Sequence, residues 1–339
     1  MKIDAYAHIL PRAYFDRLVE VAPDKRAIKR WLTIPVLHDL DARLAMMEEF
    51  GADYRQILTL SMPALESVAG PDQTPALARL ANDSMASIVA RRPERFPGFM
   101  ASLGLNNVPA ALVEMRRAIE ELGAIGIQLF TNVGGRPLDD PEFWPIFEAI
   151  ATYDLPVWLH PTRGAGCADY PGERKSKYEI WWTFGWPYET SVAMARMVFA
   201  KFFVRLPGLK VICHHMGAMV PFFAGRVGHG WDQLGSRTAD EDFAALLAEL
   251  GRPLDHFKKF IGDTSLAGSK AAIACGLDFF GAEQVVFGSD CPFDPEGGPL
   301  FIREIIAAID SLEIPEADRR KIYEDNIRRL ARHRLRLLQ

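Results

Sequence analysis

The chain has 339 residues, of which 49% are hydrophobic and 24% are charged, and its formal net charge is −5. This mild acidity argues against nucleic acid as a partner, because phosphate binding requires clustered Lys and Arg. No apolar run approaches the roughly 18 residues that span a bilayer, and the first residues lack the apolar core of a secretory signal. The four cysteines show no CxxC spacing. We therefore expect a globular protein of the reducing cytoplasm.

Short apolar runs alternate with helical periodicities along the chain. The runs are continuously apolar, which is typical of parallel strands buried on both faces. The predicted strands are Lys2–Ala5, Tyr54–Leu60, Phe96–Leu103, Ile125–Phe130, Pro156–Leu159, Leu209–Cys213, Phe257–Ile261 and Gln284–Phe287. The predicted helices are Leu40–Phe50, Pro75–Arg92, Pro109–Leu122, Pro141–Tyr153, Thr190–Arg205 and Gly268–Cys275, with a helical tail from Leu300. This alternation favours a closed (β/α)8 TIM barrel over a doubly wound sheet, with residues 1–339 as a single domain.

Two predicted connections are too long for ordinary strand-to-helix loops. They are residues 11–39 after the first strand and residues 162–187 after the fifth, and we interpret both as insertions. The second contains a dense aromatic cluster that includes Trp182 and Trp186. Long loops at the carboxyl end of a barrel commonly form lids and substrate pockets. We therefore expect Trp182 and Trp186 to contact substrate, with packing in a structural core as the alternative.

Polar residues fall at the carboxyl ends of the predicted strands. His8 follows the first strand, His160 the fifth, His214 and His215 the sixth, and Asp290 the eighth. Strand ends of a TIM barrel converge on one mouth, so these side chains should lie close together. Imidazole and carboxylate groups together suit Zn²⁺ or a similar divalent ion. The sequence therefore predicts one divalent metal site, with zinc as the first expectation and manganese as the second.

The order of these motifs resembles the amidohydrolase superfamily, and within it the branch of aminocarboxymuconate-semialdehyde decarboxylase and the γ-resorcylate-type decarboxylases. The resemblance runs from IDAYAHILP through LHPT and CHHMGAMVPFFAGR to FGSDCPF. It implies a metal ion held by His8, His160 and Asp290. It also implies that His215 is the catalytic histidine, while Asp290 binds metal or transfers a proton. His214 is then expected to point back into the barrel wall, because alternate side chains of a strand face opposite ways.

The first strand departs from the family pattern at one position. The family carries HxH or ExH there, whereas this chain has Tyr6 two residues before His8. A phenol, with an ordinary pKa of about 10, is a poorer ligand than imidazole or carboxylate unless the metal deprotonates it. We expect Tyr6 to bind substrate beside a three-ligand ion; the alternatives are ligation as a phenolate and a weakened or absent metal site. Asp4 is either a partner of a ligating histidine or an acid paired at the barrel rim.

Two arginines match positions at which the decarboxylase branch holds a substrate carboxylate. Arg43 lies in the helical segment RLAMMEEFG, and Arg226 lies eleven residues beyond His215. In the family the second arginine reaches in from a neighbouring subunit, so the resemblance implies a homodimer with a small-molecule carboxylate substrate. A guanidinium fork suits a bidentate grip on a carboxylate. The alternative for either arginine is a surface salt bridge.

The same residues support more than one function. In a metal-dependent non-oxidative decarboxylase, His215 or Asp290 protonates the carbon that loses CO2. In a metal-dependent hydrolase of a carbonyl, carbon–carbon or thioester bond, metal-bound water attacks, Asp290 takes its proton and His215 stabilises the oxyanion. A third interpretation, a catalytically silent ligand-binding barrel, is favoured only by the change at Tyr6. Following the resemblance, we expect the decarboxylase. We expect its substrate to be an aromatic or unsaturated acid, because tryptophan faces stack on flat groups.

Overall fold

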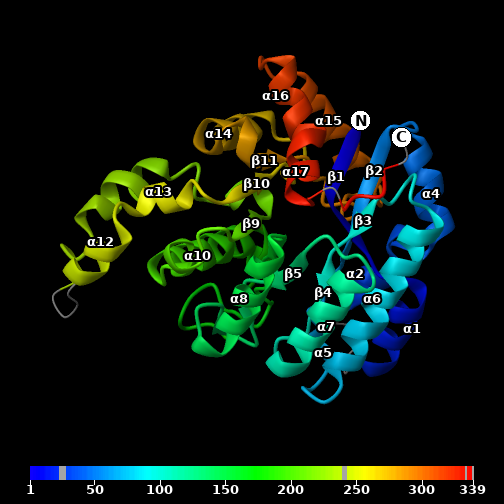
Figure 1. Cartoon of the computed structure of the whole chain (residues 1–339), viewed down its shortest axis with the longest axis horizontal. Helices are drawn as coiled ribbons and strands as arrows, with labels where there is room; N and C mark the ends of the chain where they lie inside the picture. Colours follow the sequence, from blue (N-terminus) through cyan, green and yellow to red (C-terminus); the bar gives the residue numbers. More distant parts are fainter. Residues whose placement is uncertain (23–27, 239–242, 333, 338–339) are drawn as a thin grey trace.

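The computed structural model describes residues 1–22, 28–238, 243–332 and 334–337, which form a barrel of parallel strands surrounded by helices (Figure 1). The barrel strands are β1 (Lys2–Ile9), β2 (Tyr54–Leu60), β3 (Gly98–Phe99), β4 (Ala101–Ser102), β5 (Ile127–Phe130), β8 (Pro156–His160), β9 (Lys210–Cys213), β10 (Ile261–Asp263) and β11 (Val285–Val286). Strands β6 (Asn132–Val133) and β7 (Arg136–Pro137) form a separate antiparallel pair.

Two junctions close the ring, one through the continuity of the chain and one through hydrogen bonds. Strands β1 to β3 form one sheet, and a second sheet has the order β11-β10-β9-β8-β5-β4. Only Met100 separates β3 from β4, so the two strands share one position of the barrel. At the other junction, Ala5 N donates to Phe287 O and His8 N to Cys291 O, each at 2.8 Å. The eight strand positions confirm the predicted TIM barrel.

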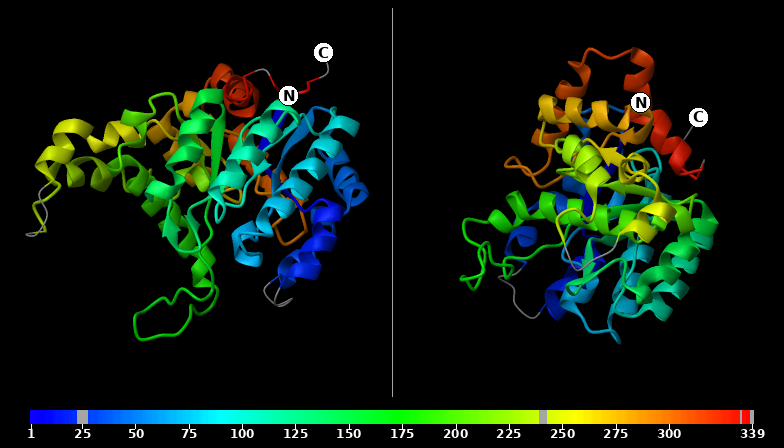
Figure 2. Two further views of the ribbon diagram at one scale, coloured as in Figure 1. Left: turned by 60° about the horizontal axis from the view of Figure 1, so that its bottom comes forward. Right: turned by 90° about the vertical axis from the view of Figure 1, so that its left-hand side faces the viewer.

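Helices follow most of the strands and pack on the outer face of the barrel (Figures 1 and 2). The α-helices are α1 (Arg12–Val21), α2 (Lys29–Leu32), α3 (Pro35–His38), α4 (Leu40–Glu48), α5 (Leu65–Val68), α6 (Thr74–Arg91), α7 (Val108–Glu120), α8 (Trp144–Tyr153), α9 (Ile180–Thr183), α10 (Gly185–Phe199), α11 (Phe202–Arg205), α12 (Ala244–Leu250), α13 (Pro253–Phe257), α14 (Lys270–Phe280), α15 (Pro299–Asp310), α16 (Glu316–Arg320) and α17 (Asn326–Leu330). Shorter helical turns are η1 (Pro141–Phe143), η2 (His215–Gly217), η3 (Arg226–Gly230), η4 (Trp231–Gln233), η5 (Ala282–Gln284) and η6 (Lys321–Asp325). Within the described residues, no helix combines the length and apolar character needed to cross a bilayer.

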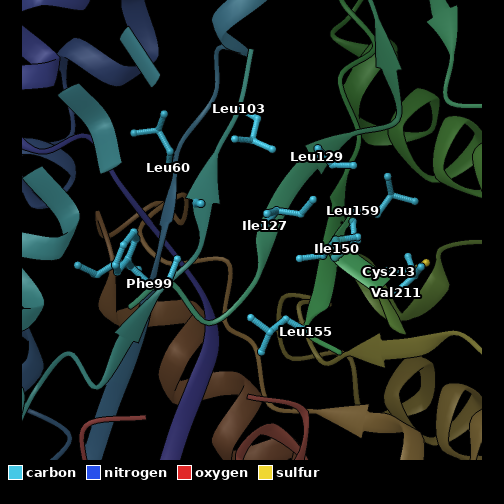
Figure 3. Packing of buried hydrophobic residues seen from close by; sticks show 14 of the residues in the cluster. Leu60, Phe99, Leu103, Ile127, Leu129, Ile150, Leu155, Leu159, Val211 and Cys213 are labelled. Carbon is cyan, nitrogen blue, oxygen red and sulfur yellow. The ribbon is translucent and has the colours of Figure 1, made fainter. Parts of the chain in front are cut away.

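The hydrophobic core has two parts. The larger part lies between the strands and the surrounding helices, where Leu129 and Leu159 of the barrel wall pack in one cluster with Ile150 of α8 (Figure 3). The smaller part fills the barrel interior and includes Trp158, whose indole nitrogen donates to Ala5 O at 2.8 Å. Ile327 of the C-terminal helix α17 belongs to this inner cluster, so the predicted helical tail helps to fill one end of the barrel.

A bulge in β1 sets which of its side chains face inward. The pairing register with β2 shifts between Asp4 and Ala7. Ala5 and Tyr6, although adjacent in sequence, consequently both pack in the inner cluster. An extra residue in one strand reverses the alternation of its side chains. The bulge therefore brings Tyr6 and, two residues on, His8 to the interior face at the barrel mouth.

The seventh strand was predicted in the wrong place. The apolar run Phe257–Ile261 was expected to be a strand, but Phe257 ends helix α13 and the strand β10 begins only at Ile261. Phe257 and Phe260 are fully buried because they pack against Trp231 and Phe203 respectively. A short apolar run signals burial and does not by itself distinguish a strand from a buried turn or helix end.

Both long connections contain helices. Residues 11–39 include α1, α2 and α3, and the aromatic stretch before residue 187 consists of α9 and the first turn of α10. Between β8 and α9 the chain forms a loop without strand or helix that extends away from the barrel in Figure 2. The predicted helix Thr190–Arg205 is two helices, α10 and α11, separated where Lys201 adopts a left-handed conformation with φ of 62°.

Candidate metal centre and active site

Four side chains from different strands meet at the carboxyl end of the barrel. His8 lies near the end of β1, and His160 is the last residue of β8. His214 is the first residue after β9, and Asp290 lies four residues beyond the end of β11. The His8 Nε2 atom lies 3.1 Å from Asp290 Oδ1, and the His214 Nε2 atom lies 3.4 Å from the same oxygen. Donor atoms of His8, His160 and His214 all lie within 4.8 Å of one another. The structure thus brings together the three predicted ligands and adds His214.

The second ring nitrogen of each histidine is fixed by the surrounding scaffold. His214 Nδ1 lies 2.6 Å from Asp263 Oδ2, and His160 Nδ1 lies 2.5 Å from Pro161 O. His8 Nδ1 lies 3.3 Å from the hydroxyl of Thr59. Such partners orient metal-binding histidines and set which nitrogen carries the proton. The arrangement leaves the three Nε2 atoms for the centre of the cluster.

The donor set fits a divalent cation. The rings of His8 and His214 are fully buried, and the Nε2 atom of each has no hydrogen-bond partner. Ligands about 2.1 Å from a tetrahedral ion stand roughly 3.4 Å apart. The separations of 3.1 and 3.4 Å between Asp290 Oδ1 and the two imidazoles agree with this spacing. An ion at the centre would bind both buried nitrogen atoms and the carboxylate oxygen that they share.

Electrostatics favour neutral imidazoles at two of the positions. Burial, together with the neighbouring histidines, holds the pKa of His160 well below its ordinary value, and burial also lowers the pKa of His8. Burial opposes ionisation of Asp290 too, but charged His214 and the other imidazoles close to the carboxylate outweigh it and hold the pKa of the carboxyl well below its ordinary range. Neutral imidazole and ionised carboxylate are the forms that bind metal.

The position of His214 corrects the sequence analysis, which placed its side chain in the barrel wall. The alternation of β9 in fact continues through His214, which is still extended with φ of −60° and ψ of 150°: Ile212 packs in the inner cluster and Cys213 in the outer one, so the next side chain points inward. The chain leaves the extended conformation only at His215, which has a φ of 57°. Sequence reasoning also missed Asp263, because the predicted seventh strand ended before it. Burial lowers the pKa of His214, but the Asp263 and Asp290 carboxylates outweigh this effect and raise it to about 9.

His215 lies beside the cluster on its more open side. Its Nε2 atom is 3.8 Å from Asp290 Oδ2, and its side chain is 19% exposed, whereas that of His214 is completely buried. Burial lowers the pKa of His215, and His214 lowers it further. Asp290 itself has a left-handed backbone with φ of 61°, and such strained positions in non-glycine residues concentrate at functional sites.

Tyr6 lies beneath the cluster and stacks on His214. The two rings have centroids 3.9 Å apart and an angle of 20° between their planes. The Tyr6 hydroxyl is buried without a hydrogen-bond partner, and burial with the nearby carboxylates raises its pKa well above 10. Asp4 accepts hydrogen bonds from the Tyr54 hydroxyl at 2.6 Å and from Ser289 N at 3.0 Å. Asp4 therefore joins β1 to its neighbours on both sides and is not the partner of a ligating histidine.

Arg43 is part of the scaffold, which corrects its assignment to substrate binding. The side chain is fully buried, and its guanidinium donates to Gln56 Oε1 at 2.6 Å, to Val36 O at 3.1 Å and to His8 O. These contacts occupy the guanidinium within the protein and tie helix α4 to the backbone of β1. A resemblance in position could not reveal this, because the partners come from three separate segments.

Aromatic rings surround the cluster. The Trp186 ring lies 5.5 Å from that of His160, and the indole nitrogen donates to Arg163 O at 2.9 Å. Trp182 is more distant, 44% exposed and 6.4 Å from Trp186. Phe293, which sequence analysis did not select, lies 5.4 Å from His8. Trp186 and Phe293 thus contact different histidines of the cluster.

Arg226 is exposed in the helical turn η3. Among the described residues, no carboxylate forms an ion pair with its guanidinium. An exposed guanidinium at this position can reach a neighbouring subunit, the role that the resemblance to the family implies.

Comparison with known proteins places the chain in a family. Residues 3–332 match the family model described as Amidohydrolase. The chain belongs to this family. It is 31% identical over 315 residues to 2-amino-3-carboxymuconate-6-semialdehyde decarboxylase of Dictyostelium discoideum, covering 86% of this chain and 82% of the relative. It is also 31% identical to γ-resorcylate decarboxylase of Rhodococcus jostii, covering 84% and 85% of the two chains.

Solved structures agree with this assignment. The dihydroxybenzoic acid decarboxylase of Polaromonas sp. JS666, solved with bound manganese and the inhibitor 2-nitroresorcinol, has a TM-score of 0.77 and 26% identity, covering 98% of this chain and 96% of that one. The 5-carboxyvanillate decarboxylase of Sphingomonas paucimobilis has a TM-score of 0.79 and 25% identity, covering 98% of both chains. The resemblance inferred from sequence, to the amidohydrolases and their decarboxylase branch, is confirmed.

Proposed function

We propose that the chain is a metal-dependent, non-oxidative decarboxylase that acts on an aromatic or unsaturated small carboxylic acid. The observation that carries this proposal is the buried cluster of His8, His160, His214 and Asp290 at the mouth of a barrel. Two relatives of the chain and a structural neighbour are named as decarboxylases of such acids. Fold alone would not suffice, because the same barrel hosts many reactions.

His8, His160 and Asp290 would hold the divalent ion. Held there, the ion would supply the positive charge that orients a substrate carboxylate and an oxygen next to it. Imidazole and carboxylate ligands suit both zinc and manganese. Sequence favoured zinc, whereas the Polaromonas neighbour contains manganese. We propose manganese or zinc, with one ion per chain.

His215 is the proposed proton donor. Decarboxylation breaks the bond between the carboxylate and its carbon, releases CO2 and replaces the carboxylate with a proton. The exposed edge of His215 reaches the open side of the cluster, while its Nε2 atom stays 3.8 Å from Asp290 Oδ2. Solvent can therefore return a proton to the partly exposed His215 after each turnover, while the ionised Asp290 carboxylate favours the protonated imidazole.

The substrate would lie between aromatic walls. Trp186 makes a T-shaped contact with His160, and Phe293 makes one with His8, so aromatic rings border the cluster at two points. Such a border suits a ring or conjugated chain. Trp182, which is more exposed, would contact only the outer end of the substrate. The Tyr6 hydroxyl and the guanidinium of Arg226 are further proposed substrate contacts, the latter from a partner subunit.

Assembly and compartment are proposed from the features of the chain itself. We propose a homodimer, because exposed Arg226 reaches no carboxylate among the described residues of its own chain. We also propose a single domain over residues 1–339 and a cytoplasmic location. The four cysteines are all free, as a reducing compartment requires.

The decisive experiment combines metal loading with a substrate screen. Protein loaded with manganese or zinc is incubated with 2,6-dihydroxybenzoate and related aromatic or muconate-like acids, and CO2 release is measured. Loaded wild type should release CO2 from at least one acid, and His160→Ala should not. A loaded protein that leaves every acid intact but hydrolyses a thioester would replace the decarboxylase with the hydrolase.

A further inference from the structure

We propose that His214 replaces the metal ligand that the family carries at position 6, so that His8, His160, His214 and Asp290 form the complete shell and Tyr6 supports it without ligating. This rests on the proposed function only in assuming that the site holds a divalent ion. The reaction catalysed does not enter the argument.

The side chains of Tyr6 and His214 are in direct contact. The family position that carries His or Glu holds Tyr6, and the ring of Tyr6 stacks on His214 with centroids 3.9 Å apart and a 20° interplanar angle. This face-to-face contact presents the ring of the tyrosine, and not its hydroxyl, to the imidazole. The tyrosine of β1 thus lies against an imidazole from the residue that follows β9.

His214 is oriented as a ligand should be. Asp263 fixes its Nδ1 at 2.6 Å, and the remaining Nε2 is buried, lacks a hydrogen-bond partner and lies 3.4 Å from Asp290 Oδ1. The rings of Tyr6 and His215 pack against the imidazole of His214, with centroid distances of 3.9 and 3.8 Å, and restrict its rotation. A carboxylate behind a histidine and packing around its ring are the usual supports of a ligating imidazole.

His215 does not compete for this role. Its side chain is 19% exposed and lies 3.8 Å from the other carboxylate oxygen of Asp290. His215 shares a second group of possible ligand atoms with His214 and Asp290, but it does not belong to the buried three-imidazole group of His8, His160 and His214. The adjacent histidines therefore divide the work: the buried one holds the ion and the accessible one faces substrate.

Metal binding tests the assignment without any turnover. Affinity for Mn²⁺ and Zn²⁺ is measured by titration, and metal content by elemental analysis, for wild type, His214→Ala, Tyr6→Phe and the matched neighbour control His215→Ala. We expect His214→Ala to lose at least 100-fold in affinity, and Tyr6→Phe and His215→Ala to stay within about threefold of wild type. Wild-type affinity in His214→Ala, or loss of the ion in Tyr6→Phe, would overturn the proposal.

Two further measurements guard against a folding artefact. X-ray absorption of the wild-type zinc protein should show three imidazoles per ion, and two would overturn the assignment of His214. Restoring the family ligand in the double variant Tyr6→His/His214→Ala should return much of the lost affinity; a folded double variant that binds no ion would show that the two positions are not equivalent. If all these results hold and no acid is decarboxylated, only the proposed reaction fails.

Discussion

Replacing Asp263 by Asn should weaken metal binding selectively, because the substitution changes one oxygen and keeps the other. Asp263 Oδ1 accepts hydrogen bonds from His215 N at 2.9 Å and Ser265 N at 3.1 Å, whereas Oδ2 contacts His214 Nδ1 at 2.6 Å. The asparagine oxygen can retain both backbone bonds. Its amide group would then face His214 Nδ1 as a donor and drive the imidazole proton to Nε2, the atom that faces the cluster.

The expected loss of metal affinity is about 10- to 100-fold, the usual effect of changing a carboxylate behind a ligating histidine. This corresponds to about 1.4–2.7 kcal/mol. The ion-free protein gives an independent magnitude. The pKa of His214 is raised from 6.5 to about 9, chiefly by Asp263 once the opposing effect of burial is overcome. The charged pair therefore contributes about 3 kcal/mol of stability below pH 6.5, which is lost as the pH rises to 9.

Two assays measure these effects. Isothermal titration gives the affinity for Mn²⁺ or Zn²⁺, and urea unfolding of ion-free protein between pH 6 and 9.5 gives the stability. Wild type should lose about 3 kcal/mol across this range, while Asp263→Asn should lose much less because the attracting charge is gone. Ser265→Ala serves as a neighbouring control. Equal metal affinity and an equal pH slope in Asp263→Asn would refute the assigned role of Asp263.

Four further substitutions test other parts of the site and scaffold. Arg226→Ala should lower kcat/KM for a carboxylate substrate by roughly 10- to 100-fold through a lost charged hydrogen bond, and unchanged kinetics would exclude it from the site. Trp186→Ala should raise KM by roughly 3- to 10-fold without changing metal affinity, and an unaltered KM would remove it from the substrate wall. Burial raises the pKa of Glu66 from 4.5 to about 7. The folded protein thus holds this proton more tightly, stability falls by about 1–3 kcal/mol from pH 4.5 to 7, and a Glu66→Gln variant unfolding with the same pH slope would contradict this. An alanine Cβ at Gly126 would stand 2.3 Å from Pro156 O, so Gly126→Ala should cost about 1–3 kcal/mol in urea unfolding and Gly70→Ala, where nothing lies within 4 Å, should not; equal losses would contradict the steric argument.

The barrel and three members of the cluster could be predicted from the sequence, because their signals are local. Continuous apolar runs mark strands buried on both faces, and polar residues that interrupt them at the end mark the mouth. His8, His160 and Asp290 each follow such a run directly. The family motifs then suggested a metal centre before any contact was known, and the metal ligation itself stays a prediction.

What the sequence did not determine depends on departures from regular structure. A bulge in β1 turns Tyr6 inward, and a left-handed turn that begins at His215 leaves His214, and not His215, as the fully buried histidine of the pair. The partners of Arg43 and the carboxylate behind His214 come from segments distant in the chain, 49 residues away in the case of Asp263. Periodicity reports which residues are buried, but only the tertiary structure decides which buried polar groups meet, because that depends on where strands end and how the chain turns between them.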